Sequence, residues 1–347
     1  MNRARALTIG RYCAAVAGGI GLSVLLMAWQ GVTGEQLGAI LRQSLFTETG
    51  LLNLLRWSTP LILVGLSFAI ASRGGLFNIG IQGQAIVGAL SAAVVGIYLP
   101  LPPVIAPVAA MVVGALAGAA WAYPAEYLKR RFNIDEVITT LLLNYIAILG
   151  AQWIVNTWLY GTVGGVVGSV VATDRIRPEA ELTRLSPLSD ANIGIVFAVL
   201  IAVAFAVSLS RGRSGFSLRA IGSSPRFAEF AGVPVAKVQR NAFLLAGALA
   251  GLMGSLEVTG IQHRFVSGFE GQLGIEAIMV SIVGANHPLG VLIAGPFFAA
   301  LKNLGLVSSQ LTDVSSYLIT LVTSAFMLCF VADPLRKLLT LRKGASR

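Results

Sequence analysis

The residues best suited to bind a solute are the amides that follow a double-glycine break in the stretch 73–84, Arg-Gly-Gly-Leu-Phe-Asn-Ile-Gly-Ile-Gln-Gly-Gln. Asn78, Gln82 and Gln84 can each donate and accept hydrogen bonds. Amides without partners are costly in hydrocarbon, and the break joins two apolar segments of membrane length. Two interpretations follow. Either a broken helix faces a water-filled path, as in many transporters, or a glycine-rich turn carries amides that only cap a helix.

Further polar side chains lie inside or at the ends of the apolar segments. They are Asn144, Gln152, Asn156, Glu257, Gln272 and Glu276. The two carboxylates support a different class of protein, because a buried carboxylate is the usual coupling group of a proton- or sodium-driven secondary transporter. Both lie near the expected outer ends of their segments, where water can solvate them. A membrane scaffold without a transport role is a third hypothesis.

Enzymatic motifs are missing from the sequence. It contains no H-E-x-x-H, no G-x-S-x-G and no G-x-x-x-x-G-K-[ST] loop, and the dipeptide Gly-Lys does not occur. The two histidines, His263 and His287, have no metal-ligand spacing and fall at segment ends. We therefore expect a protein that is not an enzyme, has no metal site and cannot itself hydrolyse ATP.

Composition supports a membrane protein. The 347 residues are 56% hydrophobic and 12% charged, with a mean hydropathy of +0.80. These values describe a chain that crosses a bilayer several times rather than a soluble domain. Cys13 and Cys329 lie at opposite ends of the chain and suggest neither a metal site nor a disulfide framework.

Apolar windows predict an all-α polytopic protein with about ten transmembrane helices in one permease domain, residues 1–347. The windows are 11–30, 52–72, 79–99, 104–123, 137–160, 191–209, 242–262, 273–286, 289–305 and 315–332. The first is read as a helix rather than a signal peptide, because it is long and lacks a good cleavage site. The eighth is short and joins the ninth through Asn286-His287-Pro288, so a re-entrant hairpin is the alternative there.

The positive charge of the chain gives its expected orientation. If the N-terminus is inside and the ten windows alternate, most of the 25 basic residues fall on inside segments, including 129–131, 211–240 and 336–347. This matches the positive-inside rule and puts both termini in the cytoplasm. Nine or eleven helices would leave a basic terminus outside. The net charge of +10 is therefore a topology signal and not a sign of nucleic-acid binding.

The longest inside segment, residues 210–241, is expected to contain a short helix. Ser224 suits the N-cap, Pro225 the first helical position and Gly232 the C-terminal stop. Two turns are unstable alone in water, so Phe227 and Phe230, with Val233, need a surface to bury against. They either fold back on the membrane domain or dock into a partner, and a surface helix at the lipid boundary is the alternative.

A weak internal similarity suggests a 5+5 inverted repeat. Residues 79–82, Ile-Gly-Ile-Gln, match residues 273–276, Leu-Gly-Ile-Glu, five windows later. Five is odd, so the two copies would run in opposite directions, as in transporters whose functional site lies between two halves. Gly114-x-x-x-Gly118 and Gly247-x-x-x-Gly251 additionally allow close packing of helices.

The motif R-x-G-L-F-N-I-G-x-x-G-Q at 73–84 resembles the signature of permease subunits of ATP-binding cassette importers. More narrowly, it is similar to the nucleoside-type branch of the branched-chain amino acid/ribose permease superfamily, which works with binding proteins of the basic membrane protein type. The resemblance covers nearly the whole chain. It adds Asn144, in the run Glu136–Tyr145, to Asn78, Gln82 and Gln84 as substrate-path candidates. The acidic Glu276 does not match the family's late glycine-rich region.

The resemblance also implies a role for the short inside helix. In the family this place is taken by a coupling helix that sits in a groove of the ATPase. The residues that would form it are Ser224, Pro225, Arg226, Phe227, Glu229, Phe230 and Gly232.

By resemblance, the chain is an importer permease of the bacterial cytoplasmic (inner) membrane that moves nucleosides or a related small solute by alternating access. Its implied partners are an ATP-binding cassette ATPase, a second permease in an expected heterodimer, and a periplasmic or lipid-anchored solute-binding protein. The chain binds no cofactor, since ATP is used by the ATPase subunit. Permeases for simple sugars or branched-chain amino acids share the architecture and stay as alternatives, beside the secondary transporter.

Overall fold

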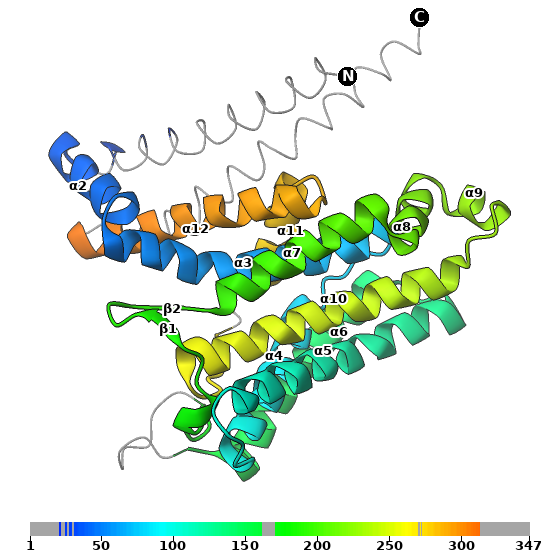
Figure 1. Cartoon of the computed structure of the whole chain (residues 1–347), viewed down its shortest axis with the longest axis horizontal. Coiled ribbons are helices and arrows are strands. Elements are labelled where there is room, and N and C mark those ends of the chain that lie inside the picture. The colour runs from blue at the N-terminus through cyan, green and yellow to red at the C-terminus, as the bar shows by residue number, and fades with distance from the viewer. Residues whose placement is uncertain are drawn as a thin grey trace, which may run out of the picture. The chain divides into compact units, whose positions relative to one another are not determined.

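The computed structural model describes residues 21, 25, 28–29, 31–161, 171–269, 271 and 273–312 (Figure 1). They form two compact units, one within residues 1–57 and 296–347 and the other spanning Ser58–Gly295. The α-helices are α2 (Gly34–Leu45), α3 (Glu48–Arg73), α4 (Ile81–Tyr98), α5 (Ile105–Phe132), α6 (Glu136–Ile154), α7 (Gly194–Arg211), α8 (Arg213–Ser223), α9 (Pro225–Phe230), α10 (Val235–Glu257), α11 (Leu273–Val283) and α12 (Pro288–Leu311).

Seven helical segments within the described residues are long and apolar enough to cross a bilayer. They correspond to windows two to seven and to window nine, and two of them are extended by π-helical turns at Val155–Leu159 and Val258–Gln262. The protein is thus a mostly helical, multi-pass membrane protein. Window 315–332, and window 11–30 except for residues 21, 25, 28 and 29, lie outside the described residues. The count of ten and the orientation stay predictions.

The eighth window forms a helix too short to cross a membrane. Helix α11 has 11 residues, which is about 16 Å of helix against about 30 Å of hydrocarbon. It turns directly into α12 at residues 284–287, where Ala285 and Asn286 adopt left-handed φ angles of 53° and 51°. Gly284 and Gly290 meet so closely that a methyl group on either would overlap the backbone of the other. The structure therefore joins α11 and α12 in a tight hairpin. Because α12 is itself long and apolar enough to cross a bilayer, the re-entrant arrangement stays a prediction.

The core of the 58–295 unit is a backbone-to-backbone contact between α4, α5 and α10. Figure 1 shows these helices side by side. A methyl group on Gly88 would overlap the backbone of Gly251, and one on Gly118 would overlap the carbonyl oxygen of Gly247. Gly254 meets the carbonyl of Ala85 in the same way. Both expected small-residue motifs therefore pack, and they pack against each other.

Two helices and one small β-hairpin were not predicted from the sequence. Residues 31–51, expected to be an outside loop, contain α2, which begins with a capping box between Thr33 and Gln36. The inside segment contains α8 in addition to the short helix. Strands β1 (Arg184–Ser186) and β2 (Ser189–Asn192) form a small antiparallel hairpin before α7. These short polar elements carry no long apolar window, which is why hydropathy alone missed them.

The glycine contact predicts that the same substitution changes stability in opposite directions at two positions. Replacing glycine by alanine inside a helix ordinarily stabilises it by about 0.5–1 kcal/mol. At Gly251 we expect Gly251→Ala to destabilise by about 1–3 kcal/mol, because its methyl group would overlap the backbone of α5. The measurement is the thermal unfolding temperature of the purified chain in detergent. Gly150→Ala on α6 is the control, since a Cβ there would have no described atom within 4 Å apart from the neighbouring residues and backbone of its own helix. A lower Tm for both variants would contradict the packing argument.

Candidate functional site

The chain between α3 and α4, residues 74–80, is irregular and is held by the amides that the sequence singled out. Asn78 and Gln84 face each other: Asn78 Nδ2 donates to Gln84 Oε1 at 2.9 Å, and Gln84 Nε2 donates to Asn78 Oδ1 at 3.2 Å. Asn78 Oδ1 also accepts from the backbone N–H of Gly80 at 2.9 Å. Both side chains are buried. Each amide thus satisfies the other while bracing the start of α4.

Asn144 fastens the same loop to α6. Its Oδ1 accepts from the N–H of Gly83 at 2.8 Å, and its Nδ2 donates to the carbonyl of Ile79 at 2.9 Å. Gly83 has no room for a side chain, because a Cβ would lie 2.9 Å from Asn144 Oδ1. We call Asn78, Gln84 and Asn144, with the backbone groups they bind, the amide clamp. Asn144 supplies hydrogen bonds that an interrupted helix cannot make for itself.

Gln82 is placed differently from the three clamp residues. It is partly exposed, and its Nε2 donates only at 3.4 Å to the carbonyl of Gly271. A bond of that length is weak and easily exchanged for another partner. Of the four amides expected on the substrate path, Gln82 therefore has the most freedom to meet a solute. The substrate-path role of all four stays a prediction.

A second irregular segment runs along the other side of this site, at residues 263–269 and 271, and the sequence analysis missed it. Gln152 of α6 donates to Ser267 Oγ at 3.0 Å, whereas Gly271 lies beside Gln82 near the start of α4. Gln152 and Asn144 are eight residues apart on α6, about 12 Å. The segment therefore returns along α6 toward the amide clamp before α11 begins. Within a membrane protein, irregular backbone inside the hydrocarbon region occurs only where it is buried in protein or lines a water-filled path.

The beginnings of α4 and α11 consequently meet. A Cβ on Gly274 would lie 3.7 Å from the carbonyl of Ile79, and Gln82 reaches Gly271. The unpaired N–H groups of a helix start carry partial positive charge, and two such starts favour electron-rich groups between them. These are the two tetrapeptides, 79–82 and 273–276, that match in sequence. Discontinuous helices that meet in this way are a common architecture for solute sites in transporters.

Charged residues gather at the end of the unit where the 74–80 loop begins. Lys129 Nζ lies 2.9 Å from Glu136 Oε2, and Glu136 Oε1 accepts from the N–H of Phe77 at 3.3 Å. Arg130 Nε lies 3.1 Å from Glu126 Oε1. Glu136 thus ties the loop to the last turn of α5. Neither acidic residue was a candidate from sequence, because their pairings depend on the turn between α5 and α6.

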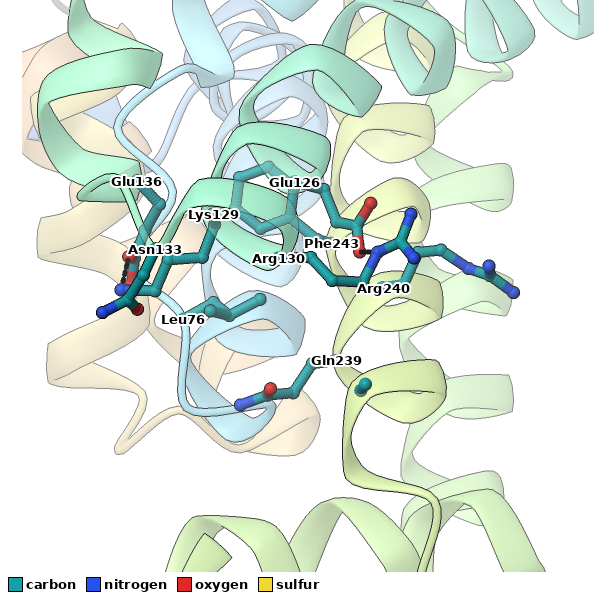
Figure 2. Close-up of a pocket in the computed structure, with 10 residues that line it drawn as sticks. Leu76, Glu126, Lys129, Arg130, Asn133, Glu136, Gln239, Arg240 and Phe243 are labelled. Carbon is teal, nitrogen blue, oxygen red and sulfur yellow. Dashed lines mark hydrogen bonds and ion pairs between the residues drawn. The ribbon is translucent and has the colours of Figure 1, made fainter.

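These ion pairs border a pocket of about 270 Å³ between α5, α6 and α10 (Figure 2). Its lining consists of Leu76, Glu126, Lys129, Arg130, Asn133, Glu136, Ala236, Gln239, Arg240 and Phe243. We call it the α5–α10 pocket. Figure 2 shows the Lys129–Glu136 pair on one side and the Glu126–Arg130 pair with Arg240 on the other.

Helices α8 and α9 lie at the same end, and α9 has the local structure expected. Ser224 caps α9 by accepting from the N–H of Phe227 at 3.3 Å, Pro225 is its first residue, and Gly232 takes a left-handed φ of 79°. Ala228 and Val233 pack with Ile221 of α8. Phe227 and Phe230, in contrast, are 68% and 91% exposed. Of the three apolar residues expected to need a surface, Val233 folds back and the two phenylalanines do not.

The α8–α10 segment also contacts the irregular loop. Gln239 Nε2 donates to the carbonyl of Gly74 at 2.9 Å. A Cβ on Gly222 would lie 3.3 Å from the carbonyl of Arg73, and one on Gly75 would lie 3.9 Å from Ile221. Arg73 in turn donates through Nε to the carbonyl of Asn286 in the α11–α12 turn. A chain of contacts therefore runs from α9 through α8 and residues 73–75 to the amide clamp.

A separate polar cluster surrounds His263, which directly follows the last turn of the α10 span. The side chain is buried, Arg184 Nη2 donates to its Nε2 at 2.9 Å, and its Nδ1 lies 3.7 Å from Glu181 Oε2. Burial lowers the pKa of His263 below its ordinary value of 6.5. The carboxylate of Glu181 opposes this, Arg175 and Arg184 lower the pKa further, and Asp190 raises it slightly. The imidazole is therefore held neutral.

The seven membrane-length helices, with two irregular segments that carry polar side chains beside them, are typical of a multi-pass membrane transport protein. A family model described as "Branched-chain amino acid transport system / permease component" matches residues 50–331. The chain belongs to this family. It is a permease component of a transport system and not an enzyme.

Individual relatives agree with this assignment. The chain is 32% identical over 329 residues to the "Guanosine ABC transporter permease protein NupP" of Bacillus subtilis, covering 92% of this chain and 88% of the relative. It is 30% identical over 250 residues to the "Nucleoside ABC transporter permease protein NupB" of Lactococcus lactis, covering 70% and 68%. It is 33% identical over 274 residues to the "Glucose ABC transporter permease protein TsgB13" of Haloferax volcanii, covering 76% and 71%. No solved structure shows significant similarity.

The amide clamp gives a mutational test. Asn144→Ala leaves the N–H of Gly83 and the carbonyl of Ile79 without their partners, each at a cost of about 1–3 kcal/mol if it stays buried. We expect a clearly lower Tm in detergent and a large loss of transport. Asn156→Ala, which truncates an exposed asparagine at the far end of the same span, is the control and should change neither quantity. Equal effects of the two variants would show that the hydrogen bonds of Asn144 are not needed for stability or transport.

The His263 cluster gives a test by pH. A histidine whose pKa is lowered by folding binds a proton more readily when unfolded, so stability is lost as pH falls below about 6.5. When the pH is lowered from 7.5 to 5.5, the Tm of the wild-type chain should fall, and the Tm of His263→Gln should fall less. His287→Gln should also reduce the slope, because burial and Arg73 lower the pKa of His287 as well. If neither substitution changes the dependence of Tm on pH, the two histidines are not its cause.

Proposed function

We propose that the chain is the permease subunit of an ATP-binding cassette importer for nucleosides. The observation that carries this proposal is the 32% identity to a guanosine permease over 92% of the chain, together with the match to a nucleoside permease. A nucleoside offers base edges and ribose hydroxyls, which amides and helix starts can hydrogen-bond. Residues 74–80, 263–269 and 271, with Gln82 between them, suit such a solute at a site that binds weakly enough to release it.

We further propose that residues 1–347 form one transmembrane permease domain of ten helices in the bacterial inner membrane, with both termini cytoplasmic. In this proposal α11 completes its crossing together with the irregular residues 263–269 and 271 before it, and α4 and α11 are related by a 5+5 inverted repeat. The positive-inside charge pattern supports the orientation. The meeting of residues 79–82 with residues 271–274 supports the repeat. In this arrangement α8, α9 and the α5–α10 pocket lie on the cytoplasmic side, and the His263 cluster lies outside.

Partners follow from the family and from α9. Exposed Phe227 and Phe230 suit a groove of an ATPase subunit, and residues 210–241 then form the coupling loop. Bacillus subtilis has two relatives of this chain, NupP and a second guanosine permease protein, NupQ, at 26% identity. This pairing supports a heterodimer of two permeases, with an external solute-binding protein. The chain itself binds no cofactor, and ATP is used by the ATPase.

The mechanism we propose is alternating access driven through α9. Closure of the ATPase dimer displaces α9, and α8 and α10 pass the displacement to residues 73–75 through Gly222 and the Gln239–Gly74 hydrogen bond. Since the amide clamp ties residues 78–84 to the middle of α6 at Asn144, the start of α4 moves relative to α11. The opening of that junction admits the solute, and ATP hydrolysis resets it.

The test is uptake of labelled guanosine by vesicles that contain this chain with its co-purified partners. We expect uptake that needs ATP and is competed by other nucleosides. Glucose is included as a competitor, because the 33% identity to a glucose permease makes sugars the second candidate substrate. The double substitution Phe227→Asp with Phe230→Asp should abolish both uptake and recovery of the ATPase, since each change puts a charge where an aromatic ring must be buried.

The control for the α9 substitutions is Phe46→Asp, which makes the same change at a phenylalanine that is 79% exposed between α2 and α3. It should leave uptake and ATPase recovery intact. Uptake that survives ATP depletion and follows a proton or sodium gradient would overturn the proposal in favour of a secondary transporter. ATP-dependent uptake competed only by glucose would keep the importer and change its substrate.

A further inference from the structure

We propose that the α5–α10 pocket binds a phosphoglycerol group, as carried by the headgroup of phosphatidylglycerol in the cytoplasmic leaflet. The transport mechanism assigns no role to the charged residues of this pocket. The pocket shares Leu76 with the irregular loop and Gln239 with the coupling contacts.

The first observation is an unsatisfied buried acceptor. The Glu126 side chain is only 5% exposed, and its Oε1 is used by Arg130. Its Oε2 is buried and has no hydrogen-bond partner among the described residues. A buried carboxylate oxygen without a donor costs free energy, so a ligand that brings a hydroxyl or amine to this point would be stabilised.

The second observation is the charge balance of the lining. Three cations, Lys129, Arg130 and Arg240, face two carboxylates, Glu126 and Glu136, which leaves one positive charge in excess. Lys129 and Arg130 each have a carboxylate partner. Arg240 forms no ion pair with any described residue. The complementary ligand therefore carries one negative charge, and the planar guanidinium of Arg240 suits a phosphate oxygen pair.

These two demands select the ligand chemistry. A phosphodiester supplies the single negative charge for Arg240, and a hydroxyl a few bonds away supplies a donor for Glu126 Oε2. An ammonium would also satisfy Glu126, but it would lie beside the guanidinium of Arg130 and repel it. A glycerol hydroxyl satisfies the acceptor without that repulsion. The volume of about 270 Å³ is ample for such a group.

The surroundings favour a lipid as the source. Tyr127 and Phe132, both exposed, pack edge to face with ring centroids 6.3 Å apart beside Arg130. Ile134, just before α6, and Ile138 on α6 are 43% and 60% exposed, so exposed apolar side chains lie next in sequence to the pocket residues Asn133 and Glu136. Exposed aromatic rings at the end of a span are typical of the level of lipid headgroups, and basic pockets between helices on the cytoplasmic side bind anionic headgroups.

The test is native mass spectrometry of the full chain, purified with the subunits that accompany it and exchanged into mixed phosphatidylglycerol and phosphatidylethanolamine. We expect preferential retention of phosphatidylglycerol. Arg240→Gln should weaken its retention about tenfold, since a charge-assisted bond to phosphate is lost. Lys237→Gln, which removes an exposed cation of the same helix that does not line the pocket, is the matched control and should have little effect. Equal losses in the two variants, or equal retention of the two lipids by the wild type, would overturn the proposal.

Two further experiments test the contact of the glycerol hydroxyl with Glu126 and whether the ligand is a lipid headgroup or a free phosphate. Glu126→Ala should abolish the preference for phosphatidylglycerol over phosphatidic acid while phosphatidic acid is still retained, because only the glycerol contacts Oε2. An unchanged preference would remove Glu126 from the site. Soluble glycerol 3-phosphate should fail to displace the lipid at equal concentration. Displacement would mean that the pocket serves the free phosphate and not the headgroup. All arms measure binding without transport, so they hold or fail independently of the nucleoside assignment.

Discussion

The structure depends on the contact of bare backbone between α4, α5 and α10. Inside a membrane there is no hydrophobic force to pull helices together, so close van der Waals packing and hydrogen bonds must do so. Gly88, Gly118 and Gly251 allow the helix backbones to approach without intervening side chains. This contact fixes the position of α4, and with it the start of α4 where the amides lie. A helix that begins deep within a protein can hold its first residue steady only if its body is immobile.

The two irregular segments show how membrane proteins keep unpaired backbone groups out of lipid. Asn144 supplies an acceptor for one N–H and a donor for one carbonyl at the break before α4, and Gln152 binds the hydroxyl of Ser267 beside the other segment. Both residues belong to α6. One regular helix therefore supports two irregular segments. Polar residues within apolar spans here stabilise the backbone, and they need not contact a solute.

Sequence alone predicted the features that are local. The glycine break, the amides at 78–84 and the cap of α9 by Ser224 and Pro225 follow from residue types and short spacings, and the structure has each of them. The capping box at Thr33 and Gln36 is equally local, but hydropathy alone predicts a loop for residues 31–51 because α2 carries no long apolar run. The return of residues 263–271 along α6 was not predictable. It rests on a hydrogen bond between residues 115 positions apart, and no periodicity reports such a contact. The pairings of Glu126 and Glu136 depend in the same way on the α5–α6 turn.

The outward pair of phenylalanines on α9 has a consequence for the cell. Phe230 is 91% exposed, and an aromatic side chain left in water next to another one forms an adhesive surface. If α9 lies in the cytoplasm and docks into an ATPase, as proposed above, a copy of the chain made in excess of its partners would show this surface to the cytosol, where chaperones and proteases recognise such patches. The two rings that dock into the partner would then also mark the unassembled subunit for removal. The amount of chain in the membrane would then be set by its slowest-made partner and not by its own rate of synthesis.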